Sequence, residues 1–254
     1  MLRKTLALGK LYLISPTRGA QAARDEENLA PSLWLYAAFV LGYMVFFRYK
    51  PLDFPDKNAP LPAEVQDLFF WFKVTLWQPP LEAAWIVFLI GLIQWFEKGS
   101  WPVRFMTAVL WTATPFILIA AYAQKGGLPK TGLAAGFAAW LALFYPLIRK
   151  APRKRWMPMI SYMMGLNVIG IVLLLPMAIA VALDAPMLFN ASQAAGGIWI
   201  LIVGTLGLRE LTGLRLSRAF MAVLLSMFFQ IALAFNLHLL GLVPKEILKA
   251  LFYA

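Results

Sequence analysis

Long apolar stretches alternate with short charged gaps along most of the chain. Crossing the hydrocarbon core of a membrane takes roughly 20 helical residues, with about 17 as the lower limit. The stretches are apolar on every face, whereas strands of a water-filled barrel would alternate apolar and polar residues. The pattern therefore predicts an all-α, polytopic transmembrane helix bundle with about seven spans, at 31–47, 81–96, 101–122, 133–148, 160–183, 191–211 and 216–240.

The composition agrees with this fold class. Hydrophobic residues make up 61% of the chain and charged residues 14%, whereas soluble globular domains hold roughly 25% charged residues. The formal net charge of +11 would suggest nucleic acid as the partner of a soluble protein. Here the basic residues are spread over several interhelical loops, so we expect the lipid bilayer with its anionic lipids as partner, and no nucleic acid. The lack of cysteine excludes disulfides and thiolate chemistry.

The basic residues also orient the chain, because cytoplasmic loops carry an excess of Lys and Arg. With seven spans, fifteen of the 23 Lys and Arg residues fall on the side of the N-terminus and eight on the other. The N-terminus is therefore predicted inside and the C-terminus outside. The densest gap holds Arg149, Lys150, Arg153, Lys154 and Arg155. This basic cluster is either a topology signal alone or a contact for an anionic lipid or an acidic partner.

The lead-in before the first span, residues 1–30, is predicted to be cytoplasmic. Its basic start and short apolar run resemble a secretory signal peptide, but Lys10 interrupts that run. We favour an uncleaved amphipathic helix near residues 2–14 that lies at the membrane surface.

The outer loop at 48–80 contains a second amphipathic pattern, at 63–78. We interpret it as an interfacial helix that ends at Pro79-Pro80, because proline disrupts a helix interior. The alternative is an eighth, half-inserted segment.

Small residues and prolines inside the spans indicate where helices pack closely or bend. Four glycines allow another backbone to approach: Gly132, Gly136, Gly197 and Gly204. We interpret them as helix packing within the chain, with a dimer seam as the alternative. Pro115 and Pro176 lie inside predicted spans and are expected to kink them.

Polar side chains inside membrane spans are functional candidates because they are costly there. The sequence places four in the spans: Asn167, Gln230, Asn236 and His238. The alternative for each is a structural hydrogen bond or a position near the interface. The carboxylates Glu82, Asp184 and Glu210 fall at predicted span ends, where they reach water, so we expect no buried proton relay.

The side-chain sets that enzymes commonly use are missing from the sequence. Hydrolysis or proton transfer needs a positioned base with a partner, yet the chain has one histidine and no cysteine. It has neither a glycine-rich phosphate loop nor a His-x-x-x-His pair. We therefore expect no catalytic residue, no cofactor, no metal site and no enzymatic activity.

Two regions carry patterns of small, aromatic and hydroxyl residues around the turns between spans. The first is Gln94-Trp95-Phe96-Glu97-Lys98-Gly99-Ser100-Trp101, followed by Ala113-Thr114-Pro115-Phe116. The second begins at Ile198-Trp199 and continues through Gly204-Thr205-Leu206-Gly207-Leu208 to Ala219. Together with Ser15-Pro16 before the first span, they resemble the Yip domain family, the Ypt/Rab-interacting integral membrane proteins and their bacterial relatives.

The resemblance implies five spans with a cytosolic N-terminus and an outer C-terminus. Residues 133–183 then form an insertion of two helices, and an even insertion preserves the orientation. The Tyr-Gly-Pro motif of eukaryotic members is absent ahead of the first span, which favours a bacterial-type member.

Two functional hypotheses follow. We favour a non-catalytic accessory or scaffold subunit of a larger membrane complex or export system, in the bacterial inner membrane, with other membrane protein subunits as partners. The alternative is a small transporter or lipid-handling protein with a cavity shaped by kinked spans. In both, residues 1–254 form a single integral membrane domain.

Overall fold

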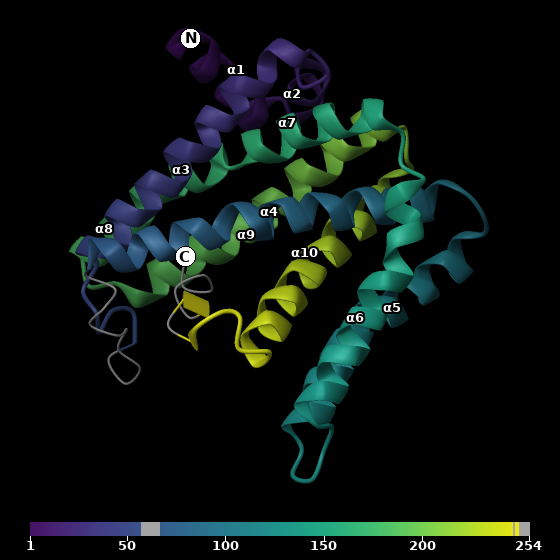
Figure 1. Cartoon of the computed structure of the whole chain (residues 1–254). Coiled ribbons are helices and arrows are strands. Elements are labelled where there is room, and N and C mark those ends of the chain that lie inside the picture. The colour runs from purple at the N-terminus through teal and green to yellow at the C-terminus, as the bar shows by residue number, and fades with distance from the viewer. Residues whose placement is uncertain (57–66, 246, 249–254) are drawn as a thin grey trace.

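The computed structural model describes residues 1–56, 67–245 and 247–248, and these fold into helices joined by short connections (Figure 1). The helices, in chain order, are α1 (Leu2–Ile14), α2 (Pro16–Ala22), η1 (Glu26–Asn28), α3 (Leu29–Tyr49), α4 (Leu68–Glu97), α5 (Trp101–Ala123), α6 (Lys130–Arg149), η3 (Arg153–Arg155), α7 (Trp156–Leu166), α8 (Val168–Ala182), α9 (Pro186–Thr212) and α10 (Leu216–Leu239).

The predicted helical membrane fold is confirmed. Seven segments of the described chain are long and apolar enough to cross a membrane, and α7 and α8 together form one of them. The sixth span is longer than predicted because α9 begins at Pro186, and a proline in the first helical turn loses no intrahelical hydrogen bond. Pro115 and Pro176 lie inside α5 and α8.

The predicted end of a surface helix at Pro79-Pro80 is wrong. Residues 63–66 lie outside the described part of the chain, and α4 runs through both prolines without interruption. Each proline removes one intrahelical hydrogen bond, but neighbouring helices can support a proline-containing helix in a bundle. The buried Trp71 packs on Phe47 of α3, with ring centroids 5.7 Å apart. The apolar face of the predicted pattern, at Leu68, Phe69, Phe72 and Leu76, is exposed, so protein covers a different face of this part of α4.

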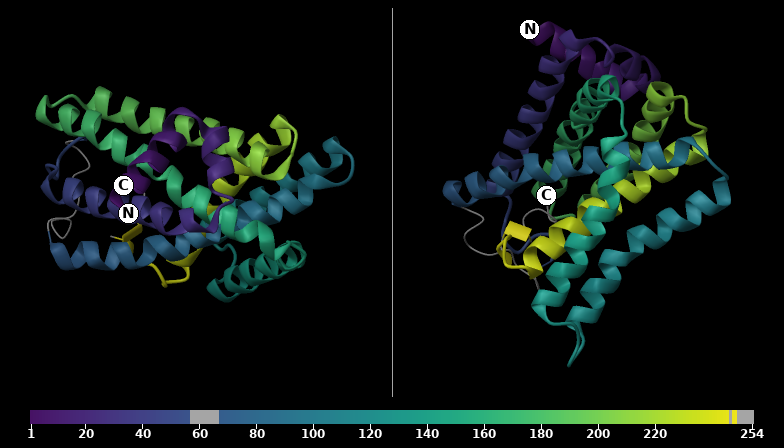
Figure 2. Two further views of the ribbon diagram at one scale, coloured as in Figure 1. Left: turned by 90° about the horizontal axis from the view of Figure 1, so that it is seen from above. Right: turned by 45° about the vertical axis from the view of Figure 1, so that its right-hand side comes forward.

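The centre of the bundle is the pair α4 and α10, which pack along each other. Helices α3, α7, α8 and α9 lie to one side of this pair, and α5 and α6 form a hairpin on the other (Figures 1 and 2). Because α6 packs on α4 and α5 while α7 and α8 pack on α3 and α9, the helices within 133–183 belong to two different parts of the bundle.

Aromatic rings fix α6 to the central pair. Phe88 of α4 and Phe229 of α10 stack with centroids 5.0 Å apart. Phe144 and Trp140 of α6 lie 5.4 Å and 5.2 Å from the Phe229 ring. All four side chains are buried, so this contact is a dense part of the core.

The lead-in is bound to the bundle rather than lying only on the membrane surface. The predicted helix at 2–14 is confirmed as α1, which packs on α3 and α7, while α2 packs on α9. The buried Tyr12 hydroxyl lies 3.0 Å from Ser32 Oγ and donates to the Ser161 carbonyl at 3.4 Å. Burial raises the pKa of Tyr12 above its ordinary value, so the phenol stays protonated and can donate.

The closest helix contacts do not all use the predicted glycines. A Cβ at Gly136 would lie 3.0 Å from Leu118 of α5, and one at Gly204 would lie 3.4 Å from Val223. A Cβ at Gly132 would meet only Leu128 and Pro129 in the connection before α6, and a Cβ at Gly197 would have no neighbour within 4 Å. Side chains of other helices fill the Cβ space at several further glycines: Gly91, Gly165, Gly170, Gly196 and Gly207.

The charged segments between spans that the sequence assigns to the inner side lie together at one end of the bundle. Arg155 forms an ion pair with Glu97, which joins the gap before α7 to the end of α4. Arg218 of α10 donates to the Gly99 carbonyl at 3.2 Å, and Arg24 of the lead-in donates to a carbonyl of α9 at 2.8 Å. An alternating topology of seven spans requires this grouping.

Candidate functional site

One carboxylate lies at the middle of a membrane-spanning helix. Glu82 is the fifteenth of the 30 residues of α4, and it is partly buried. The other Asp, Glu, Lys, Arg and His residues of the described spans lie within about two turns of a helix end. A charged side chain at the middle of a membrane helix costs about 2.5 to 3.5 kcal/mol on insertion scales, and such residues commonly mark ion or solute pathways.

Asn167 meets Glu82 at the break between α7 and α8. Its Nδ2 donates to Glu82 Oε1 at 3.4 Å and to the Met164 carbonyl at 3.2 Å. The backbone N–H of Asn167 also donates to the Met164 carbonyl, three residues back, at 3.3 Å. This tight turn separates the two helices. Asparagine suits the position because its side chain can bond to nearby backbone groups in place of regular helix.

Two further polar groups lie at the same level. The Tyr36 hydroxyl of α3 is buried without a hydrogen-bond partner and interacts electrostatically with Glu82. Gln230 of α10 donates from Nε2 to the Leu81 carbonyl at 3.5 Å. Helices α3, α4 and α10 and the α7–α8 break therefore each contribute a polar side chain to one region of the bundle.

A cavity of about 480 Å³ adjoins this polar group. Its polar lining consists of the amides of Asn167, Gln193 of α9 and Gln230 and the Tyr43 hydroxyl, and the other lining residues are phenylalanine, aliphatic residues, methionine or glycine. Glu82 does not line the cavity but reaches it through its hydrogen bond with Asn167. Binding sites for small molecules commonly combine apolar walls with a few placed polar groups, as this cavity does.

The four predicted intramembrane polar residues separate into two groups. Asn167 and Gln230 line the cavity. Asn236 is fully buried and donates to the Ala232 carbonyl at 2.8 Å, while its Oδ1 has no partner. His238 Nδ1 lies 2.8 Å from the Val243 carbonyl, beyond the end of α10. Neither Asn236 nor His238 lines this cavity.

The expectation that Glu82 lies at a span end is wrong. It rested on starting the second span at Leu81, after Pro79-Pro80, whereas α4 begins thirteen residues earlier, at Leu68. Reading the apolar residues before the prolines as part of the same helix would have placed the carboxylate at its middle. Asp184 and Glu210 do lie at helix ends, as predicted.

The basic cluster lies at the predicted inner end. Arg149, Lys150 and Lys154 are exposed, and the Arg153 side chain lies outside the described part of the structure. Arg155 is paired with Glu97. Lys154 and Arg155, together with Arg24 of the lead-in, line a second cavity of about 350 Å³. Three cationic side chains thus line one recess, with a carboxylate paired to one of them.

A second buried ionisable group lies just beyond α3. Lys50 is 2% exposed, donates to the Pro51 and Phe54 carbonyls, and lies 5.9 Å from the centroids of the Phe47 and Phe189 rings. Burial lowers the pKa of Lys50 to about 8, against the opposing effect of Asp53. The lysine does not line the polar cavity and instead connects α3 with α9.

Within the described residues, no group of three or more His, Cys, Asp or Glu side chains is arranged to hold a metal ion. No family model matches the sequence, and no curated protein or solved structure matches it. The resemblance to the Yip domain family therefore remains a prediction from the residues that carry it. The chain is an integral membrane protein by the length and apolar character of the seven spans found among its described residues.

Proposed function

We propose that this protein moves a small polar solute across the membrane, with Glu82 as the group that takes up and releases a proton. The observation that carries the proposal is the Glu82 carboxylate at the middle of α4, hydrogen-bonded to Asn167 at the break of a second span. Discontinuous helices near the membrane midplane are recurrent features of transporter binding sites.

The surroundings of Glu82 support this choice. Three amide side chains act at the cavity, so a bound solute would find both donors and acceptors there. The volume of about 480 Å³ suits a molecule the size of a metabolite. Asn167 links the solute cavity to the carboxylate, so that solute binding and protonation would affect each other through one hydrogen bond.

The test uses purified full-length protein in liposomes that enclose a pH-sensitive dye. Zwitterionic amino acids, short amines and small amides are added one at a time under an imposed pH gradient. We expect at least one solute to cause proton movement, and Glu82→Gln to reduce that flux by at least about tenfold, since glutamine cannot carry the proton. Equal flux in Glu82→Gln, or no flux with any solute, would refute the proposal.

Glu210→Gln is the matched control. Glu210 lies in the last turn of α9, where its carboxylate accepts from the exposed Gln21 at 3.0 Å. The same chemical change at this helix end should leave solute-dependent proton flux unchanged.

The accessory-subunit hypothesis also has one observation in its favour. Small residues face outward along α6, which packs on its other side against α4 and α5. They are Ala135, Ala138, Ala139 and Ala142. Such a surface lets a helix of another subunit approach closely. A stoichiometric membrane protein that remains bound through purification in mild detergent would support this function, and a lone monomer would count against it.

A further inference from the structure

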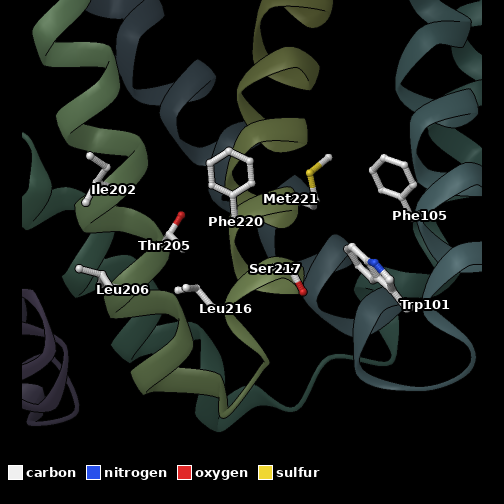
Figure 3. A pocket seen from close by; sticks show the side chains of 9 residues that line it. All are labelled: Trp101, Phe105, Ile202, Thr205, Leu206, Leu216, Ser217, Phe220 and Met221. Carbon is white, nitrogen blue, oxygen red and sulfur yellow. The ribbon is translucent and has the colours of Figure 1, made fainter.

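A groove of about 610 Å³ lies between α5, α9 and α10, away from the polar cavity (Figure 3). Its walls are almost wholly apolar. They include Trp101 and Phe105 of α5, Ile202 of α9, and Phe220 and Met221 of α10. Phe220 is exposed, so the groove is open to the surroundings of the bundle. It adjoins the α9–α10 turn, at the end of the molecule predicted to face the cytoplasm.

Thr205 places an unpaired hydroxyl in this apolar groove. The residue is 5% exposed, lines the groove, and its Oγ1 has no hydrogen-bond partner. Hydroxyls in comparable helical positions of this protein donate to the carbonyl four residues back, as at Thr112, Thr114 and Thr212. A buried polar atom without a partner indicates a ligand or other group that completes its bonding.

A positively charged side chain lies beside the groove: Arg218 does not line it but follows the lining residue Ser217. Arg218 donates to the Phe96 and Gly99 carbonyls, and its guanidinium lies 5.8 Å from the centroid of the Trp101 ring. Among the described residues, no carboxylate forms an ion pair with it. Ser217, which lines the groove, lies in the first turn of α10. The N–H groups of that turn precede the first intrahelical bond, which Ala219 donates to Arg215, so they favour an anion.

We propose that the groove binds an anionic glycerophospholipid of the leaflet at this end, with one acyl chain along the apolar walls. The lipid phosphate lies at Arg218 and the start of α10. The Thr205 hydroxyl donates to an ester carbonyl of the lipid, deeper in the membrane than the phosphate. Thr205 lies seven residues, or about 10 Å, before the end of α9, so its hydroxyl is deeper than the headgroup. From the membrane interior outward, a glycerophospholipid presents its acyl chain, then an ester and then the phosphate. The apolar walls, Thr205 and Arg218 follow one another in the same order.

A partner helix fits these observations less well. At this depth its surface would be apolar, which would leave the Thr205 hydroxyl unpaired and give Arg218 no anion. The groove is a different surface from the polar cavity, and lipid binding there does not depend on solute transport.

The test is photo-crosslinking of the full-length protein in liposomes of zwitterionic phosphatidylcholine. A minor fraction is replaced by phosphatidylglycerol or phosphatidylcholine probes that carry the same diazirine-labelled acyl chain. We expect the phosphatidylglycerol probe to label Phe105, Phe220 and Met221 about fivefold more than the phosphatidylcholine probe, because one arginine near a headgroup contributes about 1 kcal/mol. Equal labelling by both probes would overturn the proposal.

Two pairs of variants locate the effect. Thr205→Phe fills the groove and should abolish its labelling, whereas Ile198→Phe, at a 59% exposed position two turns earlier on α9, should not. Arg218→Gln should remove the preference for phosphatidylglycerol, and Arg218→Lys should retain it.

Groove labelling no stronger than at Leu143, which is 68% exposed on α6, would mean boundary lipid only. Protection of the groove by a co-purified protein or a second copy would also refute the proposal.

Discussion

Gly207→Ala is expected to destabilise the folded protein by about 2 to 3 kcal/mol, at the upper part of the range for overpacking a dense core. A methyl group at Gly207 of α9 would overlap the ring and hydroxyl of Tyr162. That ring cannot move aside easily, because Tyr162 is fully buried and its hydroxyl donates to the Val203 carbonyl at 2.8 Å. It also meets the Tyr12 ring edge-on, with centroids 5.4 Å apart.

Gly197→Ala in the same helix is the matched control. Nothing lies within 4 Å of a Cβ at Gly197, so the substitution adds helix propensity without a clash and should stabilise by about 0.5 to 1 kcal/mol. The two variants should therefore shift the apparent melting temperature in detergent in opposite directions. A Gly207→Ala protein as stable as the original would show that α9 and α7 are not packed as described.

Tyr12→Ala is expected to lower stability by about 3 to 5 kcal/mol, the usual range for removing a large buried aromatic side chain. Tyr12 is fully buried between the lead-in and the bundle. Its ring fills the Cβ space of Gly165 in α7, and its hydroxyl bonds to Ser32 and the Ser161 carbonyl. Loss of the ring should release the lead-in and make residues 1–30 sensitive to protease.

Two controls separate the ring from the hydroxyl and from the segment. Tyr12→Phe keeps the ring, and Ser32 and Ser161 still bond each other at 3.1 Å, so the cost should be about 1 kcal/mol. Leu6→Ala, at a 63% exposed position of α1, should have little effect on melting. Protease resistance of the lead-in in Tyr12→Ala would contradict its anchoring by this side chain.

The spans were predictable because partition into a membrane is nearly a local property. Each apolar segment contributes its own transfer free energy, so segment length and hydropathy suffice to locate the spans. The grouping of inner gaps was predictable for a related reason. Alternation of spans places the gaps holding Lys98, Arg155 and Arg215 on one side, and the ion pair between Arg155 and Glu97 joins two of these gaps.

The boundary at Pro79-Pro80 was not predictable from the local rule. A proline pair disfavours a helix interior, but buried contacts support α4 on both sides of it: Trp71 packs on Phe47 before the prolines, and Phe88 packs on Phe229 after them. Tertiary packing overrode the local preference. This shift of boundary moved Glu82 from a water-exposed end to the middle of a span and changed its expected role.

The sequence by itself determined that this is a helical membrane protein, with about seven spans and most basic residues on one side, because hydropathy and charge act on each segment separately. Tertiary structure alone decided which polar groups meet. Glu82 and Asn167 are 85 residues apart, and Thr205 gains its significance from an apolar groove built by three helices. Such encounters depend on how helices pack in three dimensions, and one-dimensional patterns do not encode that packing in a readable form.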